Sequence, residues 1–499
     1  MKKKKPQVTL RGVKVAGYAA AGKALARHEG KVVFIEGAVP GDVVDVRLGK
    51  NKKDWAEGHV VDFLAYAPQR VAPFCQHFGV CGGCQWQMLP YEAQLQYKHQ
   101  QVVDNLTRIG KIQLPPIEPI KGATETRFYR NKLEYTFSTR EFMAPPSASG
   151  GGSTNAQPSL ARDSVIEVGS LQSGPLRSAN PPPEADGGAA GFHARRFFDK
   201  VVAIERCWLQ PEPTNDLRNS IRDFARREGL PFYNIREHHG FLRTMQVRTA
   251  TTGQVMVNIV VGENSKGDIE KLMRFVQTSF PSLTTLLYTV NTKFNDSMHD
   301  LEPQVWHGPG FIVEQLEDFR FKIGPKSFFQ TASKQAEELY KITRWFAELD
   351  GSQVLYDLYC GTGSIGIFCS RGAKKIIGVE SIAAAVADAR ENAGMNGVSD
   401  AQFFAGDVVD VCTEGFFAQH GHPHVIITDP PRAGMHEGLV RKILDMAAPI
   451  VVYVSCNPAT QARDLALLDE KYMVTKVQPV DMFPHTHHIE NVVQLKLRN

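Results

Sequence analysis

The sequence contains no apolar run long enough to cross a membrane. Near its start, residues 15–26 faintly resemble the apolar core of a signal peptide, but Arg11, Lys14 and Lys23 break up any such core. Hydrophobic residues make up 42% of the chain and charged residues 22%, which is ordinary for a soluble globular protein and excludes a fibrous or wholly disordered one. We therefore expect a cytoplasmic protein with no membrane interaction.

Cysteine is also scarce, with 8 residues in a chain of 499. A disulfide scaffold has a far higher density of cysteine in a much shorter chain, so the sequence predicts reduced thiols. Three of the thiols, Cys75, Cys81 and Cys84, lie close together around the pair Gly82-Gly83, which lets the chain bend sharply. This local cluster indicates a metal site.

Basic residues are concentrated in the front part of the chain. Residues 1–140 contain 22 Lys and Arg against 12 Asp and Glu, a net charge of +10, and the remainder contains 35 against 41, a net charge of −6, which together give the overall +4. Neutralisation of phosphates by Lys and Arg drives nucleic-acid binding, so this asymmetry favours RNA or DNA as the partner. The run Lys2 to Lys5 has the alternative explanation of a solubilising tail.

Residues 1–63 are predicted to form a small β-barrel, because short strand-like runs alternate there with Gly and Pro. The predicted strands are residues 7–10, 31–35, 42–48 and 59–63. With its early glycines and the turn Pro40-Gly41, this stretch resembles the TRAM domain, an OB-like RNA-binding module. Such barrels bind single strands through a basic face and stacking aromatic rings. The candidate rings, each with a core position as its alternative, are Tyr18, Phe34 and Trp55.

A central domain is predicted over residues 64–320, starting with the cysteine cluster and an amphipathic helix over residues 91–109. A fourth thiol is needed to close a tetrahedral site. Cys207 is the best candidate, because the remaining cysteines lie in the later α/β region. Four cysteines suit either zinc or an iron–sulfur cluster, and the alternative ligands for zinc are His77 and His99.

This central domain is interrupted by residues 141–192, which are rich in Ala, Pro, Ser and Gly. Such a composition is typical of a disordered insertion. Strands are predicted on both sides of it, at residues 129–138, 198–204 and 245–261. The insertion is therefore expected to lengthen a surface loop and not to separate two domains.

Residues 321–499 alternate regularly between predicted strands and helices, the pattern of a parallel doubly wound, Rossmann-like α/β domain. One strand leads into the loop Cys360-Gly361-Thr362-Gly363-Ser364-Ile365-Gly366, and the next strand ends at Glu380. A glycine loop followed by a carboxylate that holds ribose hydroxyls suits both NAD and S-adenosylmethionine. Asp357, which suits the methionine amino group, and the strand end Asp429-Pro430-Pro431-Arg432 favour S-adenosylmethionine. A purely structural glycine turn is the alternative.

A thiol follows another buried strand of this domain. The apolar residues 450–454 lead into Ser455-Cys456-Asn457-Pro458. Open α/β sheets bind ligands outside the carboxyl ends of their strands, and a cysteine there supplies a soft, reversible nucleophile. The alternative is that Cys456 packs as a small hydrophobic residue, as most free cysteines do.

Five motifs occur in the order found in the RNA uracil-5-methyltransferases. They are Phe328-Phe329-Gln330, Asp357 to Gly366, Asp429-Pro430-Pro431-Arg432, Ser455-Cys456-Asn457-Pro458 and Asp481 to Glu490. The chain resembles this family over nearly its whole length. Its barrel and cysteine set are most similar to the branch that acts on 23S ribosomal RNA, because members that act on transfer RNA typically lack both. Two departures are Ala332, where the family often has Asn, and the long insertion.

The resemblance implies roles for individual residues. Cys456 is implied as the nucleophile and Glu490 as the base, and His485 and His488 are expected to organise the loop before Glu490. The implied cofactor-binding residues are Gln330, Tyr359, Glu380, Asp429, Asp357, Gly361 and Asp407. The implied ligands of a [4Fe–4S] cluster, with zinc as the alternative metal, are Cys75, Cys81, Cys84 and Cys207.

The family chemistry explains why these residue types occur together. C5 of uracil is a poor nucleophile until a thiolate adds to C6, and a base must later remove the C5 hydrogen so that the thiolate can leave. We expect a monomeric enzyme that methylates an extruded uridine of 23S rRNA with S-adenosylmethionine. The alternatives are a tRNA uridine-5-methyltransferase and a non-catalytic RNA-binding or assembly factor. A cytosine-5 methyltransferase normally has a Pro-Cys motif, and an NAD-dependent oxidoreductase leaves Cys456 and Glu490 without a role.

Overall fold

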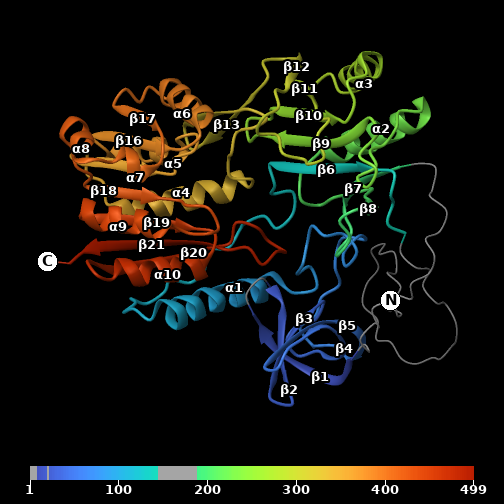
Figure 1. Ribbon diagram of the computed structural model, residues 1–499, viewed down its shortest axis with the longest axis horizontal. Coiled ribbons are helices and arrows are strands. Elements are labelled where there is room, and N and C mark those ends of the chain that lie inside the picture. Colours follow the sequence, from blue (N-terminus) through green and yellow to red (C-terminus); the bar gives the residue numbers. More distant parts are fainter. Residues whose placement is uncertain (1–7, 20–21, 144–187, 499) are drawn as a thin grey trace, which may run out of the picture. The chain divides into compact units, whose positions relative to one another are not determined.

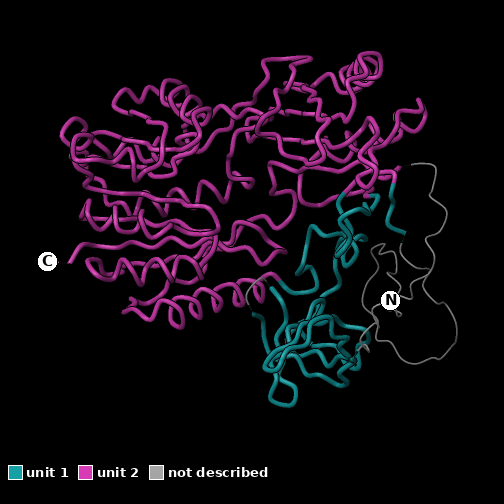
Figure 2. Tube along the Cα trace, in the orientation of Figure 1, with its two compact units in different colours: residues 1–90, 140–186, 192–203 teal, residues 91–139, 187–191, 204–499 magenta. Residues whose placement is uncertain are grey.

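The computed structural model describes residues 8–19, 22–143 and 188–498. The chain divides into two compact units (Figure 2). Unit 1 consists of residues 1–90, 140–186 and 192–203, and unit 2 of residues 91–139, 187–191 and 204–499. Lys2 to Lys5 and most of the predicted insertion, residues 144–187, lie outside the described part of the chain.

Unit 1 contains a closed β-barrel with the strand order β1-β2-β3-β5-β4 (Figure 1). Its strands are β1 (Thr9–Tyr18), β2 (Ala24–His28), β3 (Lys31–Glu36), β4 (Val43–Asn51) and β5 (Trp55–Ala65). Alternate side chains fill the interior, as the buried Val13 and Val15 of β1 and Val44 and Val46 of β4 show. The predicted barrel is confirmed. Its first strand is longer than predicted because it continues through the glycines to Tyr18.

Unit 2 begins with helix α1 (Tyr91–Asn105), which continues as one π-helical turn (Leu106–Gly110). A mixed sheet follows, whose strands in unit 2 have the order β12-β11-β10-β9-β6-β7. Its strands are β6 (Lys132–Ser138), β7 (Ala189–His193), β9 (Leu242–Thr249), β10 (Val255–Val261), β11 (Thr285–Val290) and β12 (Gln304–His307). The helices of this part are α2 (Thr214–Glu228) and α3 (Lys266–Ser279), and the short strand β8 (Val201–Ala203) belongs to unit 1.

The second sheet of unit 2 has the strand order β17-β16-β15-β18-β19-β21-β20. Its strands are β15 (Val354–Leu358), β16 (Lys375–Glu380), β17 (Ala401–Ala405), β18 (Val425–Thr428), β19 (Ile450–Ser455), β20 (Tyr472–Val480) and β21 (Glu490–Leu497). The five strands from β17 to β19 are parallel, and β21 runs antiparallel to both β19 and β20. The predicted doubly wound domain is confirmed. The hairpin β13 (Ile312–Leu316) and β14 (Phe319–Ile323) precedes it, so the predicted boundary at residue 321 falls inside a strand.

Helices cover both faces of this sheet (Figure 1), which explains why its central strands β18 and β19 are almost entirely apolar. One face packs against α4 (Ser333–Ala347), α5 (Ser364–Phe368) and α6 (Ala383–Met395). The other packs against α8 (Glu414–His420), α9 (Glu437–Met446) and α10 (Pro458–Leu468), and the short α7 (Val408–Val411) lies between β17 and α8 in the chain. None of the helices among the described residues is long and apolar enough to cross a membrane.

Helix α1 packs on this second face, although sequence pattern assigned it to the central domain. Val102 of α1 and Leu106 after it are fully buried in the same apolar cluster as Ala462 and Leu465 of α10. Burial of each of these Val and Leu side chains contributes roughly 1.5–3 kcal/mol to folding. The helix that follows the cysteine loop in sequence is therefore packed on the doubly wound sheet of unit 2.

Candidate active site

The carboxyl ends of the parallel strands carry most of the predicted site residues. Asp357 lies in β15, Glu380 ends β16, Asp429 follows β18 and Cys456 follows β19. Because parallel strands end at one edge of a sheet and these strands are neighbours, the four side chains gather at one edge.

Strand β21 brings Glu490 to the same edge. Ser455 of β19 pairs with Asn491 of β21, so Cys456 and Glu490 directly flank this pair at adjacent strand ends. Cys456 is half-buried. Burial raises the pKa of its thiol to about 11, and the charges of Glu490 and Asp429 add to the shift. The thiol is thus close to two carboxylates and is protonated at neutral pH in the free protein.

This pKa predicts how Cys456 reacts with a simple electrophile. We expect its alkylation by iodoacetamide to rise about tenfold for each pH unit between pH 7 and pH 10, because only the thiolate reacts and its fraction rises with pH below the pKa. Mass spectrometry of the peptide that contains Cys456 measures the rate. Replacement of Glu490 by Gln should increase the rate at a given pH by removing one of the charges that raise the pKa. A rate independent of pH over this range contradicts the prediction.

The glycine loop is closed by carboxylates from both neighbouring strands. Asp357 Oδ2 accepts the Gly366 N–H at 2.9 Å, and a Cβ on Gly366 would lie only 2.8 Å from this oxygen, so the close approach requires glycine. Glu380 Oε2 accepts the Gly361 N–H at 3.2 Å, and Glu380 Oε1 accepts the Ile382 N–H at 2.9 Å. These hydrogen bonds fix the loop at the carboxyl edge of the sheet.

The edge carries an excess of acidic groups. Burial raises the pKa of Asp357 to about 7, with the Gly366 N–H opposing and the charges of Asp429 and Glu380 adding to the shift. Burial likewise raises the pKa of Asp429 to about 7. It raises the pKa of Glu490 well above its usual value, and the charge of Asp429 contributes. Glu490 Oε2 is buried and has no hydrogen-bond partner among the described residues. Such a site favours a cationic ligand.

Arg432 belongs to the site, although the sequence motif that contains it predicted no role for this side chain. Its backbone oxygen accepts a hydrogen bond from Asn457 Nδ2 at 3.0 Å, which joins the loops after β18 and β19. Its Nη2 lies 3.1 Å from His488 Nδ1. The Arg432 charge opposes the upward pKa shifts of Cys456 and Glu490, so it lies close enough to stabilise their anionic forms. The signal in the sequence was the Arg that ends the Asp-Pro-Pro-Arg motif.

Gln330 lies buried just before α4. Its backbone oxygen accepts a hydrogen bond from Asn131 Nδ2 at 2.9 Å, and the same amide group donates to Ser333 Oγ at 2.7 Å. Asn131 thereby fixes the segment that carries Gln330, and it was assigned no role from sequence. Ala332, where the resemblance led us to expect Asn, is buried at the start of α4.

Tyr359 and Asp407 occupy more peripheral positions. Tyr359 is half-buried with a φ of +61°, and its pKa is raised by burial and by the charges of Asp407, Asp464 and Glu380. Asp407 is exposed, and its Oδ1 caps α7 by accepting the Val409 N–H at 2.8 Å. The structure therefore accounts for Asp407 as a helix cap, and its predicted contact with a cofactor stays a prediction.

Two histidines of the loop before Glu490 are neutral at pH 7. Burial lowers the pKa of His485 to about 4 and that of His488 to about 3. The His485 N–H donates to Gln94 Oε1 at 2.8 Å, and Gln94 Nε2 lies 3.2 Å from His485 Nδ1. Neutral, hydrogen-bonded rings suit the organising role that was expected of them better than a role as proton carriers.

The predicted metal ligands are divided between the two units. Cys75, Cys81 and Cys84 lie on one loop of unit 1, where the Gly83 N–H donates to Cys81 Sγ at 3.3 Å. Cys207 lies in unit 2, and burial raises the pKa of its thiol. Among the residues that the structure describes, no three His, Cys, Asp or Glu side chains are grouped as metal ligands. The bond to Cys81 suits a cluster thiolate, because hydrogen bonds to sulfur tune such clusters, and the metal set stays a prediction.

The aromatic side chains expected to stack on RNA contact other rings of unit 1. The ring centroid of Tyr18 lies 4.8 Å from that of Trp86, and those of Phe34 and Trp55 lie 6.3 Å apart. Tyr66, just after the barrel, is 62% exposed and stacks on a phenylalanine of β5, but sequence pattern did not single it out. An exposed ring in a linker has no periodic signal that separates it from other loop residues.

Comparisons with known proteins agree with this architecture. A model of the tRNA (uracil-5-)-methyltransferase family matches residues 311–498, and a TRAM domain model matches residues 8–61. An uncharacterized RNA methyltransferase of Bacteroides thetaiotaomicron is 48% identical over 96% of this chain and 100% of its own length. Another from Porphyromonas gingivalis is 44% identical over 97% and 99%. The chain belongs to the RNA uracil-5-methyltransferase family. The two matched models place a TRAM barrel before a methyltransferase domain in this chain.

A solved member of the family has the same fold. The tRNA (uracil-54, C5)-methyltransferase of Pyrococcus abyssi, crystallised with S-adenosyl-L-homocysteine, superposes with a TM-score of 0.71 at 26% identity. The match covers 97% of this chain and 100% of that protein. Since that enzyme acts on tRNA and covers the barrel region, the barrel does not separate rRNA members from tRNA members, which corrects the argument made from sequence.

Proposed function

We propose that this protein transfers a methyl group from S-adenosylmethionine to C5 of a uridine in 23S rRNA through a covalent bond between Cys456 and C6 of the base. The observation that carries the proposal is the pairing of Ser455 with Asn491, which sets a thiol and a buried carboxyl side by side at the ligand-binding edge of the sheet. The basic front part of the chain and its TRAM barrel support RNA as the substrate.

The acidic edge of the sheet suits S-adenosylmethionine, which is a cation and supplies an electrophilic methyl group. Asp357 and Asp429 are buried carboxyl groups, and burial raises the pKa of each to about 7. A neighbouring positive charge stabilises their anionic forms. Glu380 is held at the end of β16, where ribose hydroxyls bind in this fold. The further residues proposed to hold the cofactor are Gln330, Tyr359, Gly361 and Asp407.

Cys456 and Glu490 act in sequence in the proposed mechanism. After losing its proton, Cys456 adds to C6 of the uracil, and the electron pair of the double bond makes C5 nucleophilic. C5 then bonds to the methyl carbon, and the bond from that carbon to the sulfonium sulfur of S-adenosylmethionine breaks with its electron pair staying on sulfur. Glu490 removes the hydrogen that remains on C5, and the electron pair of that C–H bond restores the double bond as the Cys456 sulfur leaves. The raised pKa of Glu490 makes its carboxylate a stronger base for this step.

Modification of tRNA is the second candidate, and it is favoured by the full-length match to a tRNA enzyme. We expect cells that lack this protein to lose 5-methyluridine from one position of 23S rRNA and to keep it in tRNA, as measured by mass spectrometry of nuclease fragments from both purified RNAs. Complementation by the intact gene should restore the modification, and complementation by a Cys456→Ala variant should not. Loss from tRNA with unchanged rRNA favours the second candidate.

The cysteine set is proposed to hold a [4Fe–4S] cluster in a structural role, with zinc as the alternative. Protein purified without oxygen is expected to contain iron and acid-labile sulfide in equal amounts, as measured by elemental and sulfide analysis. Replacement of Cys81 by Ala should remove both. The matched control is Cys412→Ala, since Cys412 is buried in the methyltransferase domain. Zinc in place of iron would establish the alternative metal, and no metal in anaerobically purified protein contradicts both.

A further inference from the structure

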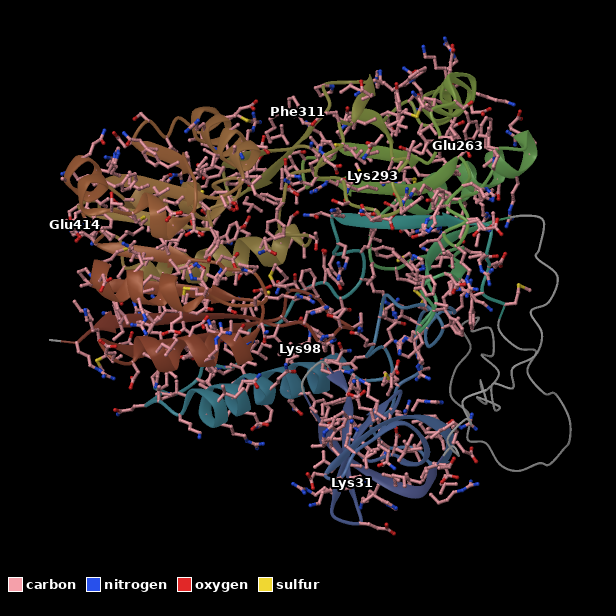
Figure 3. The ribbon with its side chains drawn as sticks, viewed as in Figure 1. Lys31, Lys98, Glu263, Lys293, Phe311 and Glu414 are labelled. Carbon is pink, nitrogen blue, oxygen red and sulfur yellow. The ribbon has the colours of Figure 1, made fainter. Side chains whose placement is uncertain are left out.

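A fully buried ion pair links helix α1 to the loop that leads to Glu490. Lys98 Nζ lies 2.6 Å from Asp481 Oδ1, and both side chains are 0% exposed. Lys98 is labelled on α1 in Figure 3. Asp481 follows β20 directly, and more than 380 residues separate it from Lys98 in the sequence. The pair thus ties the start of unit 2 to its end.

Two other residues of the same helix face contact the same loop. The Tyr91 hydroxyl donates to Asp481 Oδ2 at 2.8 Å and accepts the Ala123 N–H at 2.7 Å. Gln94 binds the backbone N–H and the ring of His485. Tyr91, Gln94 and Lys98 are spaced by three and four residues, so they line one stripe of α1. We call these three residues the α1 clasp.

The clasp contacts the backbone of the loop as well as its side chains. Lys98 Nζ donates to the Phe483 backbone oxygen at 3.1 Å, and the Phe483 N–H donates to Asp481 Oδ1 at 3.0 Å. His485 has a φ of +64°. Residues other than glycine rarely adopt this backbone conformation, so the surrounding contacts must stabilise it. The two hydrogen bonds between Gln94 and His485 supply such a constraint.

The loop held in this way ends at Glu490. Val480 of β20 pairs with Glu490 of β21. Asp481 is the next residue after Val480, so the loop begins directly beside the strand pair that contains Glu490. No described residue hydrogen-bonds to Glu490 Oε2. The position of this carboxyl group therefore depends on the backbone that carries it and on how that backbone is anchored.

A buried ion pair needs an explanation beyond stability. Removing two charges from water costs about as much as their attraction returns, and a well-packed apolar pair in the same place usually folds as well or better. What a hydrogen-bonded pair does provide is one defined geometry, because each oxygen and each N–H must find its partner. The clasp gives that geometry to the segment from Asp481 to His485.

We propose that Tyr91, Gln94 and Lys98 are positioning residues for proton removal from C5. By fixing the loop between β20 and β21, they hold the Glu490 carboxylate where it reaches the hydrogen on C5 of the methylated adduct. The proposal rests on the proposed function of Cys456 and Glu490. It assigns the clasp to the last step of the reaction and leaves the addition of Cys456 and the methyl transfer unaffected.

The test uses RNA with an ordinary uridine at the target position and S-adenosylmethionine with a tritiated methyl group. It measures how much of the label is on RNA covalently bound to the protein and how much is on free RNA. The main variant combines Lys98→Met with Asp481→Asn, which removes both charges and keeps an acceptor for the Phe483 N–H. Tyr91→Phe is the milder variant. We expect the covalent adduct to persist roughly 10- to 100-fold longer than in the unmodified protein, since displacement of a catalytic group by about 1 Å has effects of that size.

The control is a variant destabilised elsewhere. Leu272→Ala opens a cavity in α3, far along the chain from the site, and should lower the amount of folded protein without changing the division of label. An adduct lifetime equal to that of the unmodified protein in both clasp variants overturns the proposal and leaves the clasp a structural contact. Absence of any adduct and any methylated RNA with the unmodified protein counts instead against the proposed function.

Discussion

Replacement of Cys456 by Ala is expected to abolish RNA methylation and covalent RNA binding together. Without a thiolate at C6, C5 of uracil does not become nucleophilic, so no neighbouring group restores the reaction. We expect the rate of methyl transfer to fall by at least about 10⁴-fold, in line with the deletion of nucleophiles in other covalent enzymes. Transfer of tritiated methyl groups to RNA measures the first effect. A denaturing gel with 5-fluorouridine RNA measures the second.

A matched cysteine distinguishes the chemical role from damage to the fold. Cys369 is fully buried on the face of the sheet that α4, α5 and α6 cover, and it has no part in the proposed mechanism. A Cys369→Ala variant should form the 5-fluorouridine adduct and methylate RNA, once corrected for its folded fraction. An adduct that survives in Cys456→Ala refutes the assignment of the nucleophile. Loss of activity in both variants would indicate damage to the fold and not the loss of a catalytic thiol.

The local features of the site were predictable because each depends on a short stretch of sequence. Strand β15, the glycine loop and Glu380 follow one another in the chain, and the apolar run before Cys456 marks a buried strand end. The parallel sheet then brings these ends together by a general rule of α/β folds. This is why Cys456 and Asp429 could be assigned to one edge before the structure was known.

Contacts between distant segments left no comparable signal. Lys98 reads as a solvent-exposed residue of an amphipathic helix, because lysine is rarely buried without a partner and its partner Asp481 lies at the other end of the chain. The packing of α1 on α10 was hidden for the same reason. Asn131 is a further example, since its hydrogen bonds to the Gln330 segment depend on tertiary structure alone.

Replacement of Glu490 by Gln should trap the reaction after methyl transfer. Gln has nearly the shape of Glu but cannot accept a proton, so the hydrogen stays on C5 and the bond from Cys456 to C6 cannot break by elimination. We expect turnover to fall by about 10²- to 10⁴-fold, the usual contribution of a general base. The methylated protein–RNA adduct should accumulate, and tritium from the methyl donor should run with the protein on a denaturing gel.

The pH dependence of adduct release follows from the environment of Glu490. Burial and the charge of Asp429 raise its pKa, so at lower pH the carboxyl group is protonated and cannot act as a base. Release of the methylated RNA should therefore accelerate as pH rises through this pKa and then level off. In the Glu490→Gln variant, release should be slow and its rate should not increase with pH. The matched control, Glu437→Gln, removes an exposed carboxylate that is paired with Arg441 and should leave release unchanged. Rapid, pH-dependent release from Glu490→Gln would assign the base to another residue, with Asp429 the nearest candidate because its charge acts on Glu490 directly.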